Sequence, residues 1–266
     1  MKIFAETERL ILRELLPTDI EGMFELDSNP IVHKYLGNKP VKTKQETEII
    51  IQSIIDQYKD RGIGRWAAIE KSSGDFIGWS GLKLNTGEKD SLNGKQDFYD
   101  IGYRFMPRYW GKGYATESAI AALDYGFKVK QYKTIVGIAL IDNVASKKVL
   151  QKIGLQYIED FDCEGTIASW YELNINNYRE LLKINYRKKY YQENKERRNK
   201  LLKEKYKSDE NYRKKVKKYY REKYNEDDEY KKKTLKNAKR RYHEDEEYRK
   251  KTIERAKARY KKNKNS

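Results

Sequence analysis

The sequence has few of the residues from which metal clusters and nucleophilic triads are built. Its 266 residues include one cysteine, Cys163, and two histidines, His33 and His243. A single thiol excludes an intramolecular disulfide and is typical of a protein from a reducing compartment. A zinc cluster, or a Cys-His or Ser-His nucleophile system, needs such side chains close together. We therefore expect no metal site and no nucleophile of this kind.

Long apolar runs are also missing. The first ten residues, MKIFAETERL, lack the apolar core of a signal peptide, and no stretch approaches the roughly 20 apolar residues that a membrane-spanning helix needs. We expect no transmembrane segment and a cytoplasmic, or nucleic-acid-associated, location.

Positive charge is concentrated at one end of the chain. Residues 178–266 hold 35 lysines and arginines against 16 acidic residues, a net charge of +19, whereas residues 1–177 hold 23 against 25. We predict a domain over residues 1–177 and a basic tail over 178–266. A near-neutral domain with a basic appendage is typical of contact with nucleic acid or another polyanion. The alternative is a solvated extension with no dedicated partner.

The spacing of apolar and turn-forming residues predicts the elements of the first region. Capping signatures at Thr18 to Glu21 and at Thr43 to Glu46 begin the first two helices, and Gly154 ends the last one. The expected order is strand, two helices, three strands, helix, strand, helix and two strands. This order indicates a mixed α/β fold with a central sheet flanked by helices.

A glycine-rich turn carries the most specific chemistry. It reads Arg108-Tyr-Trp-Gly111-Lys-Gly113-Tyr-Ala-Thr-Glu117 and lies between an expected strand and an expected helix. Glycines let the backbone approach a ligand, and exposed N–H groups at a helix N-terminus make an anion site suited to a pyrophosphate. Thr116 replaces the third glycine of a dinucleotide-binding motif, and the spacing of a P-loop is absent.

The turn resembles the acetyl-CoA motif of the GNAT acetyltransferases, Arg/Gln-x-x-Gly-x-Gly/Ala, which Arg108, Gly111 and Gly113 fill. Further matches are similar to the ribosomal-protein N-terminal (Rim-type) branch and extend over about residues 6–174. They are Thr7-Glu-Arg-Leu-Ile-Leu-Arg13, Ile101-Gly-Tyr103, Asn143-Val-Ala-Ser146 and Lys152-Ile-Gly154-Leu.

The resemblance implies direct transfer of an acetyl group from acetyl-CoA to an amine in a ternary complex. It implies that the strands over 98–105 and 134–141 splay apart to admit the pantetheine arm. The backbone of Tyr103, Arg104 and Phe105 would bind pantetheine, and Asn143 would contact the cofactor. The pyrophosphate would be held by Arg108, Tyr109, Trp110, Gly111, Lys112, Gly113 and Tyr114.

Two residues are candidates for catalysis. Asp100 lies where family members often carry a carboxylate and would act as the base, directly or through a water; its alternative is a structural salt bridge. Ser146 would hydrogen-bond the departing thiolate; its alternative is a favourable place near a helix N-terminus. The acceptor is expected to be a protein N-terminal or other protein amine. The alternatives are a small amine, or a non-catalytic nucleic-acid-binding protein built on this scaffold.

Tyrosines in the tail recur every 18 residues, as at Tyr212, Tyr230 and Tyr248, and each unit begins acidic and continues basic. Eighteen residues are five turns of an α-helix. One long helix fits this period, as do short helices separated at Ser208, Asn225 and His243, and the tail alone is expected to be helical or disordered. Basic residues interleaved with tyrosines suit phosphate contacts and base stacking, so DNA, RNA or a ribosome is the expected partner. A solvated helix or an anionic membrane are the alternatives.

Overall fold

The computed structural model describes residues 1–264 and contains one eight-stranded sheet. The strand order is β1-β2-β3-β4-β5-β6-β8-β7, and every neighbouring pair is antiparallel except β5 with β6. The strands are β1 (Ile3–Glu6), β2 (Leu10–Glu14), β3 (Arg65–Glu70), β4 (Phe76–Asn85), β5 (Phe98–Phe105), β6 (Thr134–Leu140), β7 (Gln156–Cys163) and β8 (Thr166–Asn174). The predicted mixed α/β fold is confirmed.

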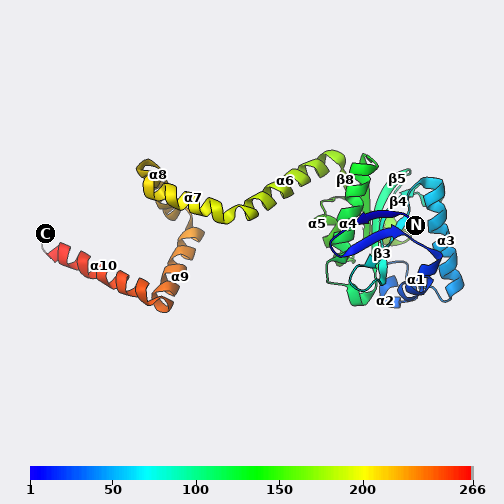
Figure 1. Cartoon of the computed structure of the whole chain (residues 1–266), viewed down its shortest axis with the longest axis horizontal. Coiled ribbons are helices and arrows are strands. Elements are labelled where there is room, and N and C mark those ends of the chain that lie inside the picture. The colour runs from blue at the N-terminus through cyan, green and yellow to red at the C-terminus, as the bar shows by residue number, and fades with distance from the viewer. Residues whose placement is uncertain (265–266) are drawn as a thin grey trace. The chain divides into compact units, whose positions relative to one another are not determined.

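Helices cover both faces of this sheet (Figure 1). One face packs on α4 (Tyr114–Asp124), which a π-helical turn extends to Val129, and on α5 (Val144–Lys152). The other packs on α1 (Ile20–Asp27) and α3 (Lys44–Arg61). A short helix, α2 (Pro30–His33), follows α1. Among the described residues, no helix is long and apolar enough to cross a membrane.

The two capping predictions have different outcomes. Thr43 caps α3 as predicted, since its side chain accepts a hydrogen bond from the backbone N–H of Glu46 at 3.3 Å. The prediction at Thr18 is wrong. A 3-10 turn (Pro17–Asp19) precedes α1, because Pro17 fixes the backbone there and the Asp19 carboxylate is taken by the N–H of Leu16.

The parallel strands β5 and β6 diverge. They pair at two positions only, Asp100 with Val136 and Ile101 with Gly137. On its other side, β5 is paired with β4 from Phe98 to Phe105. Residues 102–105 of β5 therefore present a free backbone edge toward the gap that opens beside β6, as the resemblance predicts.

The chain divides into a compact unit, Met1–Tyr186, and a second unit, Arg187–Ser266. The sequence predicts the division after residue 177, but the first turns of α6 (Ile175–Glu193) belong to the core of the compact unit. Tyr178 is buried and its ring stacks on Phe127 with 4.6 Å between centroids. We call residues 1–186 the sheet domain.

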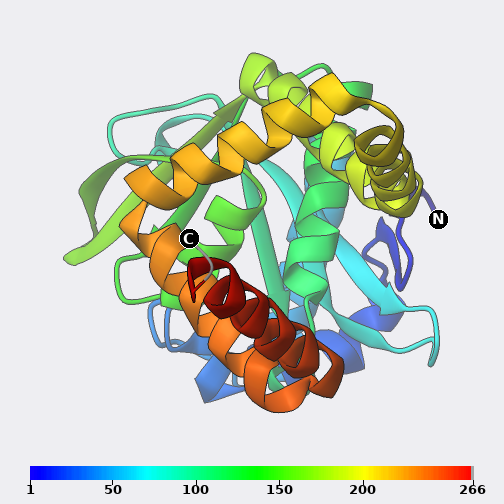
Figure 2. The same cartoon turned by 90° about the vertical axis from the view of Figure 1, so that its left-hand side faces the viewer.

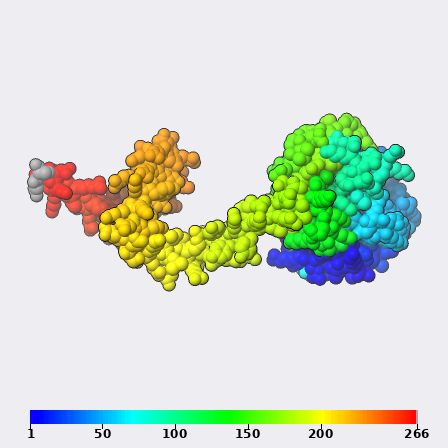
Figure 3. All heavy atoms as spheres, turned by 90° about the horizontal axis from the view of Figure 1, so that it is seen from above, coloured from blue at the N-terminus to red at the C-terminus, as the bar shows by residue number. Residues whose placement is uncertain are grey.

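The tail is helical. It contains α7 (Lys195–Ser208), α8 (Glu210–Glu226), α9 (Asp228–Glu244) and α10 (Glu246–Lys264). Figure 2 shows single helices that meet their neighbours at sharp bends, and the space-filling view of Figure 3 shows the same part of the chain as a slender, bent segment. The bends lie at Asp209, Asp227 and Asp245, one or two residues after the predicted breaks. No described residue of these four helices is buried, so the tail has no core of its own.

Candidate active site

The glycine-rich turn adopts the conformation that its glycines predict. Gly111 and Gly113 have φ angles of +74° and +88°, where a side chain is disfavoured. Gly113 is the N-cap of α4, and the first bond of the helical ladder runs from the N–H of Glu117 to the Gly113 carbonyl at 3.0 Å. The N–H groups of residues 114–116 precede this ladder and have no acceptor within the helix. The turn thus has the backbone geometry and the helix-dipole field that suit an anion.

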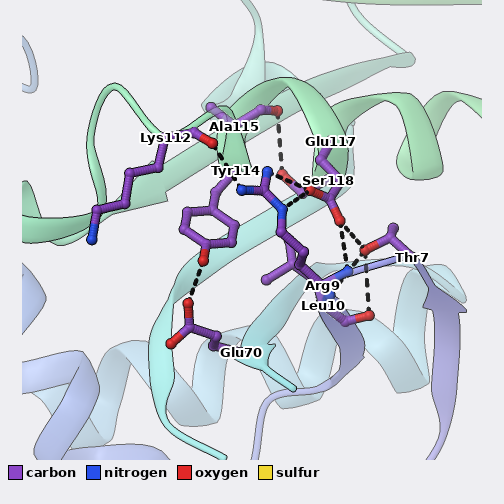
Figure 4. Close-up of polar contacts among 9 residues, drawn as sticks. All are labelled: Thr7, Arg9, Leu10, Glu70, Lys112, Tyr114, Ala115, Glu117 and Ser118. Carbon is purple, nitrogen blue, oxygen red and sulfur yellow. Dashed lines mark hydrogen bonds and ion pairs between the residues drawn. The ribbon is translucent and has the colours of Figure 1, made fainter. Parts of the chain in front are cut away.

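A clamp from the turn between β1 and β2 holds this glycine-rich turn (Figure 4). The Glu117 carboxylate accepts hydrogen bonds from the Thr7 hydroxyl at 2.6 Å, and from the backbone N–H and Nε of Arg9 at 2.9 and 2.7 Å. Arg9 Nη1 donates to the Lys112 carbonyl at 2.9 Å. We call Thr7, Arg9 and Glu117 the clamp. It fixes the backbone between the two glycines, and the sequence gives no sign of it beyond the placing of Glu117 in a first helical turn.

Burial and hydrogen bonding oppose each other in the clamp. Burial raises the pKa of Glu117, but the hydrogen bonds from Thr7 and Arg9 outweigh it and hold that pKa below its usual value. Tyr114, the first residue of α4, donates to Glu70 at the end of β3, and the guanidinium of Arg9 lies 4.2 Å above the centroid of its ring. Its hydrogen bond to Glu70 is the main reason that the pKa of Tyr114 is raised. The clamp carboxylate is therefore ionised at neutral pH and the Tyr114 hydroxyl is protonated.

The other predicted pyrophosphate residues lie on the same turn with partners of their own. Arg108 forms an ion pair with Glu25 of α1, and the amine of Lys112 lies 5.2 Å from the centroid of the Tyr109 ring. Trp110 is 49% exposed, and its indole N–H donates to the Phe105 carbonyl at 2.6 Å. In this structure Arg108 ties the turn to α1, so the anion site is formed chiefly by backbone.

A tyrosine spans the gap between β5 and α5. The Tyr103 hydroxyl lies 3.1 Å from both the hydroxyl and the carbonyl of Ser146. Burial raises the pKa of Tyr103 to about 12, so this hydroxyl is a donor at neutral pH. Asn143 is the N-cap of α5, where its side chain accepts from the N–H of Ser146 at 3.1 Å. The Asn-x-x-Ser motif thus caps a helix and also places a hydroxyl beside the gap.

Asp100 lies on the face of β5 opposite to the side chain of Tyr103. One carboxylate oxygen contacts Arg65 at 2.5 Å, and the other accepts from the side-chain amide of Asn85 at 2.8 Å. Arg65 also donates to the backbone carbonyl of Asp100 at 2.8 Å. Both oxygens are therefore engaged, as in the salt-bridge alternative.

A second polar cluster on this face is not evident from the sequence. Arg104 of β5 reaches the buried carboxylate of Asp27 on α1 at 2.5 Å, and its guanidinium lies 4.8 Å from the ring of Trp79. His33 lies beside them and is 7% exposed; its Nε2 is 4.0 Å from Oδ1 of Asp27, and neither ring nitrogen has a hydrogen-bond partner among the described residues. Burial, and then the charge of Arg104, lower the pKa of His33, so the ring is neutral at neutral pH.

These features fit a long ligand that carries a pyrophosphate. A side-chain carbon at Gly111 would meet no described atom within 4 Å, so the backbone there is open to a ligand. Beside it, residues 102–105 have no partner strand along the gap between β5 and β6, although the Phe105 carbonyl already accepts from the Trp110 indole. An anion at the turn and an extended arm along this edge would use both, and both suit acetyl-CoA.

Comparison with known proteins agrees with this geometry. Residues 9–156 match the family model of the acetyltransferase (GNAT) domain. The uncharacterized N-acetyltransferase YoaA of Bacillus subtilis is 30% identical over 151 residues, 57% of this chain and 81% of that protein. The uncharacterized protein YkkB of the same organism is 33% identical over 165 residues, 62% of this chain and 88% of that protein.

Solved structures show the same fold. A GNAT-family acetyltransferase from Bacillus anthracis is 27% identical, with a TM-score of 0.54, and the match covers 66% of this chain and 99% of that one. These matches leave out the tail, since the family model ends at residue 156. The chain therefore belongs to the GNAT acetyltransferase family and is an acetyl-CoA-dependent N-acetyltransferase.

Proposed function

We propose that the acceptor is a protein amine, most simply a protein N-terminus, acetylated by direct transfer in a ternary complex. The N–H groups that follow Gly111 bind the pyrophosphate, and the free edge of β5 binds the pantetheine arm. The acceptor approaches from the face that carries Asp27, Arg104 and Asp100. Acetyl-CoA supplies the activated acetyl group, and the chain's own groups position the two substrates and move the proton.

The charges of the first helix are the observation that carries this choice of acceptor. The four carboxylates of the 3-10 turn (Pro17–Asp19) and of α1 are each paired with a basic side chain: Asp19 with Arg13, Glu21 with Lys44, Glu25 with Arg108 and Asp27 with Arg104. A polyamine carries several positive charges and needs unpaired carboxylates to bind them. Here the two buried carboxylates, Asp19 and Asp27, are already neutralised, and only the solvent-exposed pairs at Glu21 and Glu25 could be displaced easily. A protein N-terminus brings one amine and no such requirement.

A small amine is the second candidate. Spermidine N(1)-acetyltransferase of Escherichia coli is 25% identical to this chain over 173 residues, 83% of that protein. This likeness favours a polyamine acceptor, in contrast to the pairing of the carboxylates on α1.

We assign the proton steps to groups with the right protonation state. His33 is neutral, buried and unbonded to the described residues, so it can accept the proton of the incoming ammonium directly or through a water. In this assignment Asp100 has a structural role, because Arg65 and Asn85 engage both of its carboxylate oxygens. The hydroxyls of Tyr103 and Ser146 serve as donors toward the departing thiolate.

Two variants separate the candidate bases. We expect His33→Gln to lower kcat and to remove the acidic limb of the pH-rate profile. Asp100→Asn should lower stability and leave the shape of that profile unchanged. The assignment to His33 is wrong if the Gln variant keeps the wild-type profile and Asp100→Asn removes the limb.

The acceptor is tested by rate measurements on matched substrates. The full chain is assayed with acetyl-CoA and three acceptors: a peptide with a free N-terminus, the same peptide with its N-terminus blocked, and spermidine. We expect kcat/KM to be highest for the free peptide, with the acetyl group on its α-amine by mass spectrometry. Faster turnover of spermidine would reject the proposal in favour of the small amine.

The tail has a targeting part in this proposal. The net charge of +19 over residues 178–266 attracts polyanions and brings the sheet domain to acceptors bound to nucleic acid, such as ribosomal proteins.

A further inference from the structure

The three bends between α7 and α10 share one kind of cap. At each of them an aspartate caps the next helix: Asp209, Asp227 and Asp245 accept from the N–H three residues later at 2.8, 2.8 and 2.9 Å. The same aspartates donate their own N–H to a carbonyl of the preceding helix at 2.8, 3.0 and 2.9 Å. The 18-residue repeat is therefore a repeat of bends as well as of helices.

A base and a tyrosine fix each bend further. The Nζ atoms of Lys205 and Lys223 lie 4.9 and 5.0 Å from the ring centroids of Tyr212 and Tyr230. Cζ of Arg241 lies 4.3 Å from the ring centroid of Tyr248. In every case a cation near the end of one helix covers a ring in the first turn of the next. This contact bridges the two helices across each bend.

The inside of the first bend is an aromatic groove. It lies between α7 and α8, has a volume of about 620 Å³ and is lined by Tyr206, Tyr212, Tyr219 and Tyr220. Tyr219 and Tyr220 are 57% and 52% exposed, and their rings meet edge to face with 5.2 Å between centroids. The volume is within the range of sites that hold a small organic group, about 300 to 1,000 Å³. Exposed ring faces of this kind suit a flat, unstacked ring.

Lysines line the same groove. Lys203, Lys207 and Lys215 are on its walls and are exposed. None of the three has an ion pair with a described carboxylate among the bridges of the tail, which instead join neighbours along single helices, such as Lys214 with Glu210. The groove therefore combines aromatic faces with free positive charge.

We propose that this groove binds single-stranded nucleic acid, with a base stacked on its tyrosines and the flanking phosphates on its lysines. Stacking on tyrosine and phosphate contact with lysine are the two interactions by which proteins bind single strands without sequence preference. Tyr224 with Tyr230, and Tyr242 with Tyr248, repeat the Tyr206–Tyr212 pair at the later bends. Asn237 and Ala238 stand where the next unit would need the counterparts of Tyr219 and Tyr220, so the complete groove belongs to the first bend. This inference rests on the targeting role proposed above for the tail and names the class of ligand that the tail binds.

A duplex and a membrane fit this groove less well. Bases in a duplex are stacked on each other, so their faces cannot reach Tyr206 or Tyr219. A membrane surface needs a wide apolar face. Residues 178–266 instead carry 35 basic and 16 acidic residues, and the groove gathers four tyrosines inside one bend.

The test measures binding by the full chain to a fluorescein-labelled 20-nucleotide oligothymidylate, followed by fluorescence anisotropy at several salt concentrations. Tyr206→Leu with Tyr219→Leu should weaken binding about tenfold, since stacking on one base is lost. Leucine favours helices, and far-UV circular dichroism checks that the helices remain. The matched control is Tyr260→Leu, the equivalent position of the last repeat unit, which no described helix follows.

A second variant tests the phosphate contacts. Changing Lys203, Lys207 and Lys215 to Gln should reduce the slope of log K against log salt by about 2, as expected for three lost contacts to a single strand. Its control changes three exposed lysines of the sheet domain, Lys39, Lys42 and Lys89, to Gln, which lowers the net charge equally. That control should leave the slope near the wild-type value.

Three results would overturn the inference. They are unchanged affinity in the tyrosine variant, an equal loss in Tyr260→Leu, or binding as tight to a 20-base-pair duplex or to dextran sulfate as to the oligothymidylate. Acetyl transfer to the peptide is measured on the same samples. Absence of acetyl transfer with intact strand binding would count against the proposed acceptor alone. Intact acetyl transfer with no strand binding would count against the groove alone.

Discussion

The sheet domain and the tail achieve their structure in opposite ways. In the domain, residues far apart in sequence meet, as Thr7 and Arg9 do with Glu117, and large side chains such as Trp66 are fully buried. In the tail, contacts join residues within a helix or across one bend, and no described residue of α7 to α10 is buried. The domain can therefore hold a precise site, whereas the tail holds a repeated surface.

Because of this difference, we expect the sheet domain and the tail to unfold separately. All four tryptophans, Trp66, Trp79, Trp110 and Trp170, lie in the sheet domain, so their fluorescence reports its unfolding. Far-UV circular dichroism also reports the tail helices. The two signals should change at different denaturant concentrations, because burial stabilises the domain and only local contacts stabilise the tail.

The largest effect is expected in the core of the domain. Leu82 of β4 is fully buried, so Leu82→Ala should lower the free energy of unfolding by about 2 to 5 kcal/mol. Tryptophan fluorescence in urea measures this change. The matched control, Leu235→Ala in the tail, removes a side chain that is 53% exposed and should leave the tryptophan transition in place. A shift of that transition in the control would mean that the two units unfold together.

A smaller effect is expected from the clamp. Glu117→Gln removes a charge that accepts from Thr7 and Arg9, and should cost about 1.5 to 3 kcal/mol of stability and raise the KM for acetyl-CoA. Because the pKa of Glu117 is lowered in the folded domain, its contribution is present above the pKa of an unfolded glutamate.

That contribution is lost as the pH falls through the lower, folded pKa. The difference in stability between wild type and Glu117→Gln should therefore narrow on acidification below about pH 4.5. Urea titrations at several pH values measure it. A difference that stayed constant down to pH 2 would show that the carboxylate charge is not what stabilises the turn.

The smallest effect is expected at a bend of the tail. Asp227→Ala removes the N-cap of α9 and should destabilise that helix by about 1 kcal/mol, seen as lost ellipticity at 222 nm. Asp227→Asn, which also caps helices, is the control and should retain the signal. Equal losses in both variants would argue against capping as the cause, and tryptophan fluorescence should be unchanged in either.

The sequence predicts what depends on local pattern. The alternating strands, the caps at Thr43 and Gly154, and the turn at Gly111 and Gly113 follow from short-range rules, and the structure contains them. It misses β1, because four residues with two intermediate side chains give little alternation. It also misses α2, a four-residue helix behind Pro30.

Contacts over long distances in sequence could not be predicted in this way. The partners in the clamp lie 108 and 110 residues apart, and Arg104 lies 77 residues from Asp27. Such pairs are set by which strands and helices the fold brings together. The positions of the bends in the tail, in contrast, can be predicted from the sequence, because an aspartate three residues before each repeated tyrosine is a capping signal.

The binding of acetyl-CoA tests the central claim most directly. Isothermal calorimetry would compare the full chain, a chain ending at Tyr186, and the full chain with Gly111→Asp and Gly113→Asp, whose added side chains and charges occupy the anion site. We predict that the first two bind acetyl-CoA with the same affinity and that the double variant does not bind. Tryptophan fluorescence checks that the double variant is folded. Equal binding by the double variant, or no binding by the folded wild type, would contradict the placing of the cofactor at this turn.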